Sequence, residues 1–108
     1  MPSLVCSTSD VALGAVAPFA VETADGTSVL IALVHDEDDS WYALEDRCSH
    51  GRQRLSDGEV WEGGLECVRH GSIFDLKTGC PRTLPATEPV HIFDVTVDGE
   101  SVLVDVAN

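Results

Sequence analysis

The chain has 108 residues, which is enough for one domain with a modest core, and its hydrophobic fraction of 44% is typical of a folded globule. The formal net charge is −13, and this acidity excludes nucleic acid as a partner because the phosphate backbone would repel the protein. No stretch approaches the roughly 20 apolar residues that cross a bilayer, so we expect no membrane partner.

The first half of the chain predicts strands. The apolar run "VALGAVAPFAV" (11–21) has no basic residue before it, since the first one in the chain is Arg47, so we interpret it as a turn and a strand instead of a signal sequence. We therefore expect a cytoplasmic protein, whose reducing environment favours metal ligation over disulfides for its four cysteines. The stretches "TSVLIALVH" (27–35) and "WYALE" (41–45) predict a hairpin across the acidic turn "DEDDS" (36–40), with two aromatic residues suited to cross-strand packing.

The middle of the chain, residues 48–79, is rich in glycine and contains only short strand signals. These signals lie around residues 59–61, 65–68 and 72–75. No window of this segment, or of the rest of the chain, has a sustained helical period.

The end of the chain predicts a second hairpin. The stretches "HIFDVTV" (91–97) and "ESVLVDV" (100–106) alternate apolar and polar residues, and Asp98-Gly99 is a strong turn signal between them. The whole pattern predicts an all-β single domain over residues 1–108, with a small loop-rich subdomain inserted at about residues 46–82.

Two short motifs each pair one cysteine with one histidine. "CSH" contains Cys48 and His50, and "CVRH" contains Cys67 and His70. Thiolate and neutral imidazole are common ligands of zinc and iron, and two such turns facing each other would supply two sulfurs and two nitrogens. One interpretation is a structural zinc site with four ligands. Usual zinc patterns, however, place two cysteines in one turn and two histidines in the other, whereas here each turn has one of each.

This order of ligands resembles that of the Rieske iron–sulfur proteins. The pattern C-x-H…C-x-x-H, with 16 residues between His50 and Cys67, is spaced as in that family, and the likeness continues through "LSDGEV", "HGSIFDL", "TG" and a proline-bearing loop up to Pro89. The resemblance implies a Rieske-type antiparallel β-sandwich or barrel body with a cluster-binding subdomain and one [2Fe–2S] cluster. It also implies that Cys48 and Cys67 hold one iron while His50 and His70 hold the other.

The resemblance further implies residues that surround the cluster. They are Gly51, Gly71, Ser72 and Pro85. Respiratory members of the family have two further cysteines joined as a disulfide, which this chain lacks, and a tyrosine hydroxyl bonded to a cluster sulfur where this chain has Phe74. Because hydrogen bonds to cluster sulfurs raise the reduction potential, we expect a low-potential protein.

The basic residues gather in the predicted subdomain. All six lie between positions 47 and 82, where they meet five acids for a net charge of +1, whereas the rest of the chain has 14 acids and no base. Opposite poles of this kind orient a protein as it meets its partners. We expect three arginines beside the ligand histidines to contact acidic partner surfaces: Arg52, Arg54 and Arg69. The alternative is that these arginines pair with acids inside the subdomain: Glu62, Glu66 or Asp75.

Within the family, the chain resembles the ferredoxin components of bacterial aromatic-ring-hydroxylating dioxygenase systems. This resemblance implies a monomeric electron carrier that is not itself an enzyme. It would take single electrons from an NAD(P)H-dependent, flavin-containing ferredoxin reductase and pass them to a terminal non-haem iron oxygenase. Three alternatives remain open: a Rieske protein of iron–sulfur cluster assembly, a nitrite reductase small subunit, and the structural zinc-binding module.

Four cysteines and histidines have no place in this cluster. We expect Cys6 and Cys80 to be small buried hydrophobic residues, and His35 and His91 to be ordinary strand histidines. Two histidines without a carboxylate-rich pocket do not suggest the mononuclear iron site of an oxygenase, so we predict no catalytic residue.

Overall fold

The computed structural model describes residues 3–23, 25–47, 54–67, 71–82 and 88–106. Within these ranges, nine strands form two antiparallel sheets, and the helical elements are two 3-10 turns, η1 (Thr8–Asp10) and η2 (Leu55–Asp57). In the same ranges, neither turn is long and apolar enough to cross a membrane. The prediction of an all-β fold is confirmed.

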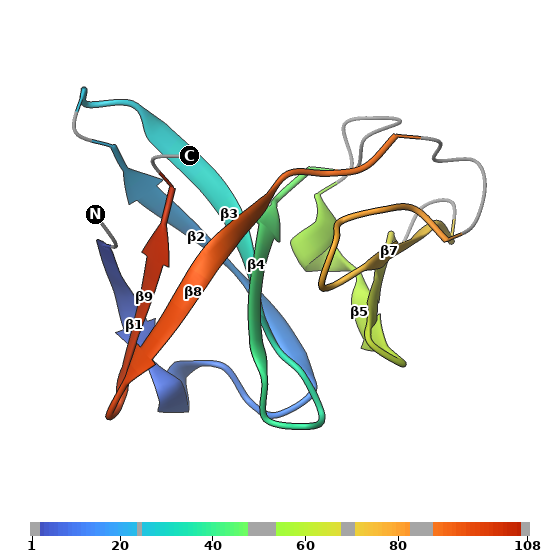
Figure 1. Cartoon of the computed structure of the whole chain (residues 1–108), viewed down its shortest axis with the longest axis horizontal. Coiled ribbons are helices and arrows are strands. Elements are labelled where there is room, and N and C mark those ends of the chain that lie inside the picture. The colour runs from blue at the N-terminus through green and yellow to red at the C-terminus, as the bar shows by residue number, and fades with distance from the viewer. Residues whose placement is uncertain (1–2, 24, 48–53, 68–70, 83–87, 107–108) are drawn as a thin grey trace.

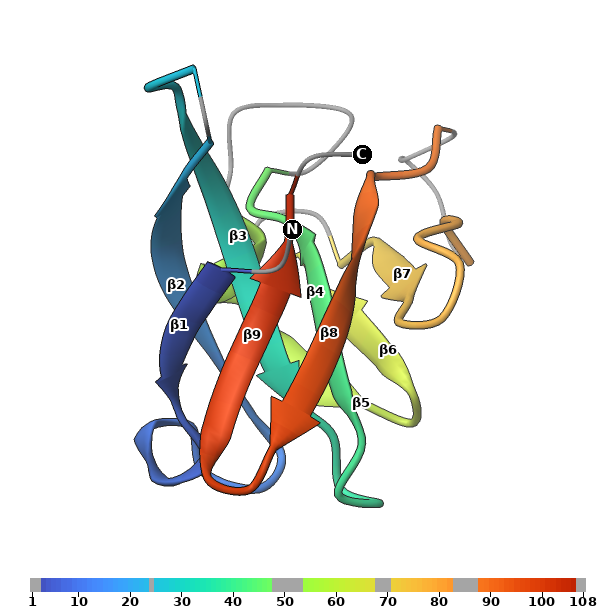
Figure 2. The same cartoon turned by 60° about the vertical axis from the view of Figure 1, so that its left-hand side comes forward.

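The larger sheet, which we call the body, has six strands in the order β1-β9-β8-β4-β3-β2. Their bounds are β1 Ser3–Ser7, β2 Ala15–Glu22, β3 Ser28–His35, β4 Trp41–Glu45, β8 Ile92–Asp98 and β9 Ser101–Asp105. The first and last strands of this order, β1 and β2, approach each other, so the sheet is nearly closed into a barrel (Figure 2).

The smaller sheet has three strands and projects from one side of the body (Figure 1). Its strands are β5 Glu59–Trp61, β6 Gly64–Glu66 and β7 Ile73–Asp75, in that order across the sheet. In the body, β4 pairs directly with β8, and Ala43 lies opposite Phe93 although the whole small sheet separates the two strands in the sequence. The chain therefore forms the small sheet between two neighbouring strands of the body, while the bounds of the predicted subdomain stay a prediction.

Two hydrophobic cores follow from this arrangement. The barrel core lies inside the body and contains Val11, Val21, Ile31, Leu33, Ala43, Val102, Val104 and Val106. The inter-sheet core joins the body to the small sheet and contains Ala32, Val34, Leu44, Leu55, Leu65, Cys67, Phe74, Leu76 and Val90. Residues of β3 alternate between the two cores, and this double burial explains why its sequence is a continuous apolar run instead of an apolar–polar alternation.

The predicted hairpin of the first half is confirmed as β3 and β4. The register places His35 opposite Trp41, and their rings stack with centroids 4.1 Å apart and planes 13° apart. The apolar run before them is a turn at Gly14, with φ of 78°, followed by β2. The first half therefore folds as its turn and strand signals predict.

The C-terminal hairpin is also confirmed, but its turn is one residue later than predicted. Asp98 is still paired, opposite Ser101, so the two loop residues are Gly99 and Glu100. Gly99 has φ of 62°, and a glycine with positive φ at the first loop position is the pattern of a type II′ turn. Strand β1 had no predicted counterpart, because its five residues carry little alternation and become a strand through pairing with β9.

The double burial of β3 leads to a prediction on stability. Leu33 is fully buried in the barrel core, whereas Leu30, on the same strand, is 51% exposed. Leu33→Ala should lower the free energy of unfolding by about 2–5 kcal/mol, and Leu30→Ala by about 0.5 kcal/mol or less. Urea unfolding followed by circular dichroism measures both, and equal losses for the two variants would contradict this packing.

Candidate metal centre

The structure describes one of the four predicted ligands, Cys67. The other three, Cys48, His50 and His70, lie outside the described residues. Within the described ranges, no three His, Cys, Asp or Glu side chains come together as a metal site. The ligand set thus stays a prediction. The structure describes the residues that border the two predicted ligand loops.

Cys67 follows β6 directly and is fully buried in the inter-sheet core. Its sulfur forms no disulfide. Its backbone N–H donates to the carbonyl of Ser72 at 2.7 Å, and its carbonyl accepts the N–H of Gly71 at 2.9 Å. Gly71 has φ of 75°, a conformation that glycine adopts without strain. The base of the second predicted ligand turn is therefore closed by backbone hydrogen bonds, and a free thiol lies at its start.

The residues after this turn enter the small sheet. Ser72 is fully buried, and its carbonyl is engaged by Cys67, while a role of its hydroxyl toward a cluster stays a prediction. Phe74 is fully buried among the apolar side chains of the inter-sheet core, where a ring without a hydroxyl fits. The other two residues predicted to surround the cluster, Gly51 and Pro85, lie outside the described residues.

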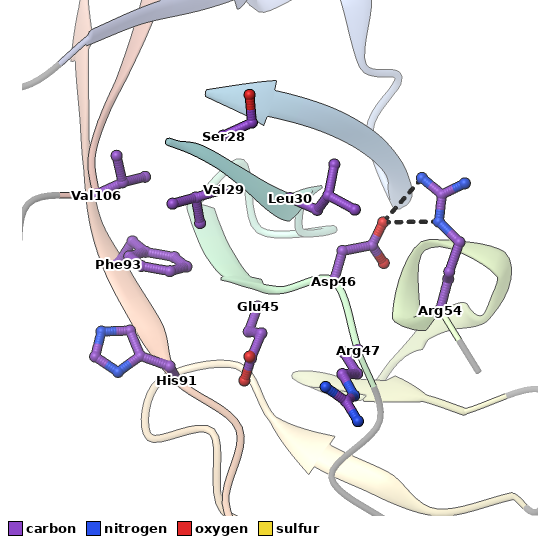
Figure 3. A pocket seen from close by; sticks show the side chains of 10 residues that line it. All are labelled: Ser28, Val29, Leu30, Glu45, Asp46, Arg47, Arg54, His91, Phe93 and Val106. Atoms are coloured by element: carbon purple, nitrogen blue, oxygen red, sulfur yellow. Dashed lines mark hydrogen bonds and ion pairs between the residues drawn. The ribbon is translucent and has the colours of Figure 1, made fainter. Parts of the chain in front are cut away.

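The first predicted ligand loop follows Asp46 in the sequence, and the buried carboxylate of Asp46 contacts the residues at which the loop ends. Oδ1 of Asp46 accepts the backbone N–H of Ser56 at 2.7 Å, and Oδ2 accepts the Ser56 hydroxyl at 2.7 Å. Arg54 donates a hydrogen bond from Nε to Oδ2 at 3.3 Å, and its Nη2 forms an ion pair with the same oxygen, also at 3.3 Å (Figure 3). The sequence analysis did not single out Asp46. It is one of the 14 acids outside residues 47–82 and belongs to no motif, so nothing in the sequence signals that it is buried or paired.

Arg54 is the described member of the three predicted docking arginines. Its side chain is 49% exposed, and its guanidinium pairs with Asp46, an acid that the alternative of internal pairing had not included. Arg52 and Arg69 lie outside the described residues. The docking role of all three stays a prediction.

The same pair borders an open hollow of about 690 Å³ on the body (Figure 3). Its lining combines apolar side chains of β3, β8 and the chain end with charged and imidazole groups. The lining residues are Ser28, Val29, Leu30, Glu45, Asp46, Arg47, Arg54, His91, Phe93 and Val106. The Asp46 carboxylate is turned toward Arg54, so its charge is compensated by the protein itself.

The segment that leads to the proline loop is held by Arg82. Its guanidinium donates to the carbonyls of Glu62 at 3.0 Å and Gly63 at 3.1 Å and to Oδ2 of Asp75 at 2.9 Å. Its backbone N–H donates to the carbonyl of Ile73 at 2.6 Å. A side chain at Gly64 would come within 3.1 Å of the guanidinium, so this glycine leaves the space that Arg82 crosses.

The hydrogen bond from Arg82 has an electrostatic consequence for Asp75. It holds the pKa of the Asp75 carboxyl below its ordinary value, and the backbone N–H of Lys77 adds to this shift. Burial acts in the opposite direction but does not outweigh these bonds.

The predictions for the remaining cysteines and histidines have mixed outcomes. Cys80 is exposed, so its expected burial is wrong: it lies in the turn after β7, where its backbone is bonded to Thr78 and Asp75. Cys6 is half-buried, and burial, with a smaller effect of Asp10, raises the pKa of its thiol.

His35 is confirmed as a structural strand residue. Its Nδ1 lies 3.0 Å from the carbonyl of Val11, and its Nε2 lies 2.5 Å from Asp39. His91 directly precedes β8 and is exposed, with its ring tilted against Phe93.

Comparison with known proteins identifies the relatives of this chain. A family model described as "Rieske [2Fe-2S] domain" matches residues 1–94. The anthranilate 1,2-dioxygenase ferredoxin subunit of Burkholderia cepacia is 44% identical over 63 residues, which are 57% of this chain and 58% of that protein. The 3-phenylpropionate/cinnamic acid dioxygenase ferredoxin subunit of Shigella boydii is 40% identical over 80 residues, which are 73% of this chain and 74% of that protein.

Solved structures give the same picture. The ferredoxin of carbazole 1,9a-dioxygenase from Nocardioides aromaticivorans superposes with a TM-score of 0.80 and 36% identity over 96% of both chains. A chain from a complex of reduced oxygenase and oxidized ferredoxin in carbazole 1,9a-dioxygenase gives a TM-score of 0.81 and 33% identity, covering 95% of this chain and 91% of that one. A nitrite reductase small subunit from Mycobacterium tuberculosis, described as putative, has a TM-score of 0.81 at 18% identity, with 96% and 93% covered, and shows the fold alone.

The Arg82 contacts generate a prediction on acid sensitivity. Because the pKa of Asp75 is lowered in the folded state, its stabilising effect is fully present above the unfolded value of about 3.9 and is lost as the pH falls through the folded value. Arg82→Gln should raise the pKa of Asp75 toward the value of the unfolded chain and lower the free energy of unfolding at neutral pH by about 1 kcal/mol. An NMR titration of the Asp75 carboxyl and a denaturation curve measure the two effects. An unchanged titration curve in the variant would contradict the assigned cause.

Proposed function

Because the chain belongs to the Rieske [2Fe-2S] domain family, we propose that it is the ferredoxin of an aromatic-ring-hydroxylating oxygenase system. The observation that carries this proposal is the 40% identity, over 73% of the chain, to a dioxygenase ferredoxin subunit. The carbazole dioxygenase ferredoxin, similar over 96% of both chains, supports it. The protein is on this view an electron carrier and not an enzyme.

The proposed ligands are Cys48 and Cys67 for one iron and His50 and His70 for the other. The donor set of two thiols and two imidazoles fits a Rieske cluster, and the buried, disulfide-free Cys67 fits a ligand that must be shielded from water. A bound cluster of this kind accepts and releases one electron at a time. Gly51, Gly71, Ser72 and Pro85 are proposed to surround it.

The reduction potential is proposed to lie at the low end of the Rieske range. The aromatic ring at position 74 has no hydroxyl to donate toward a sulfur, and it is fully buried in the inter-sheet core. Fewer hydrogen bonds to the sulfurs leave the reduced form less stabilised, which lowers the potential.

The electron route is proposed to run from an NAD(P)H-dependent flavin reductase, through this protein as a cytoplasmic monomer, to a terminal oxygenase. The oxygenase is supported by the similarity to a chain from an oxygenase–ferredoxin complex. The charge pattern supports docking through the subdomain, where the six basic residues of the chain lie on an otherwise acidic protein. Arg52 and Arg69 are the better candidates for contact, since the guanidinium of Arg54 already pairs with Asp46.

Neither alternative within the family has an observation that favours it. The nitrite reductase likeness, at 18% identity, is one of fold, and nothing among the relatives reported above points to cluster assembly. The zinc-binding module is disfavoured by the match to the Rieske [2Fe-2S] family over residues 1–94.

The cofactor is tested directly on the purified protein. We expect a red-brown solution with about two irons and two acid-labile sulfides per chain, and an EPR signal that appears on reduction with dithionite. Metal analysis and EPR measure these properties. A colourless, EPR-silent protein with one zinc would overturn the proposal.

Docking is tested by charge reversal away from Asp46. Arg52→Glu and Arg69→Glu together should slow second-order electron transfer to the oxygenase by about tenfold at low ionic strength and weaken its salt dependence, because steering depends on these charges. Lys77→Glu, the same charge reversal at one exposed residue after β7, is the control, and it is also compared with Arg52→Glu and Arg69→Glu made singly, so that the changes of charge match. Stopped-flow kinetics decide the matter, and a double variant that reacts as fast as the control would exclude this docking surface.

A further inference from the structure

Asp46 is the only charged residue among the buried residues of the described ranges, with 4% of its surface exposed. Removing a carboxylate from water is costly unless hydrogen bonds and an opposite charge compensate it. Asp46 has both, in Ser56 and Arg54. The free-energy cost of burying this carboxylate needs an explanation. The proposed electron transfer does not supply one, because it does not use the charge of Asp46.

Among the described residues, the polar groups that bind the Asp46 carboxylate are all hydrogen-bond donors. They are the backbone N–H and hydroxyl of Ser56, at 2.7 Å each, and two guanidinium nitrogens of Arg54, at 3.3 Å each. Both carboxylate oxygens are occupied as acceptors. An asparagine at this position would turn an NH2 group against one of these donors, so the amide cannot reproduce the arrangement.

These contacts link two parts of the protein that border the first ligand loop. The backbone N–H of Asp46 donates to the carbonyl of Leu30 on β3 at 3.1 Å, which ties this end of the loop to the body. Ser56 belongs to η2, whose Leu55 is fully buried in the inter-sheet core, and this ties the other end to the small sheet. In the sequence, residues 47–55 lie between Asp46 and Ser56, and Cys48 comes two positions after Asp46.

We propose that Asp46 is a positioning residue for the first ligand loop. This inference rests on the proposed function and adds to it a residue that is not a ligand. Its carboxylate fixes the distance and orientation between Asp46 and Ser56, the two described residues that border the sequence segment containing Cys48 and His50. Hydrophobic burial of Leu55 anchors η2 to the core, but apolar contacts have no directionality, and the directional bonds to Asp46 set how the loop leaves and re-enters the fold.

The experiment compares Asp46→Asn with Val104→Ala in the cluster-loaded protein. Val104 is fully buried in the barrel core, so its truncation destabilises the body and leaves the bonds that Ser56 and Arg54 make to Asp46 in place. The readouts are the rate at which visible absorbance is lost in excess iron chelator, at a temperature where every variant is folded, and the EPR spectrum of the reduced protein. We expect loss at least tenfold faster in Asp46→Asn with an altered EPR spectrum, and loss within twofold of the original protein, with an unchanged spectrum, in Val104→Ala.

Milder variants cover the case in which Asp46→Asn does not fold. Ser56→Ala removes one bond to the carboxylate, and Arg54→Gln removes the ion pair while leaving the bonds from Ser56. At least one of them should lose the cluster three times faster than Val104→Ala. Rates equal to that control in every variant that folds would overturn the inference. If the original protein contains no iron and sulfide, the proposed function fails and this inference with it, whereas a normal cluster with equal loss rates overturns the inference alone.

Discussion

Strand β3 is covered on both faces, and the connection between the two halves of this protein depends on that constraint. Ile31 and Leu33 face the barrel core, while Ala32 and Val34 face the inter-sheet core. A strand that is buried on both sides cannot shift its register by one residue without exchanging the side chains of two cores. The body and the small sheet therefore share one fixed element, and the loops of the small sheet start from a defined place.

In addition to the two apolar cores, polar contacts hold the ends of the loops. Asp46 joins the ends of the first predicted ligand loop. Backbone hydrogen bonds from Cys67 to Ser72 and from Gly71 to Cys67 close the second, and Arg82 holds the segment that leads to the proline loop. Hydrogen bonds are directional and apolar contacts are not, so the cores fix where the small sheet lies while the polar contacts fix how each loop departs from it. Such a division suits the electron carrier proposed above.

Charge is distributed unevenly along the chain. The six basic residues lie within residues 47–82, and the rest of the chain is strongly acidic. Two of these basic residues form ion pairs within the protein: Arg54 pairs with Asp46, and Arg82 pairs with Asp75. The charge left for steering a partner is thus smaller than a count of arginines suggests, and it depends on residues outside the two ion pairs.

The sequence by itself determined the strand class and the family of this protein. Apolar runs and turn residues predicted the β3–β4 and β8–β9 hairpins, because strand signals and turn signals are local, and the pattern C-x-H…C-x-x-H indicated the family for the same reason. Only the tertiary structure decided the pairing of β1 with β9, the position of the last turn, the exposure of Cys80 and the burial of Asp46. Each of these depends on residues far apart in the chain: Asp46 is buried because β3 and η2 meet beside it, and no property of the letters around position 46 encodes that meeting.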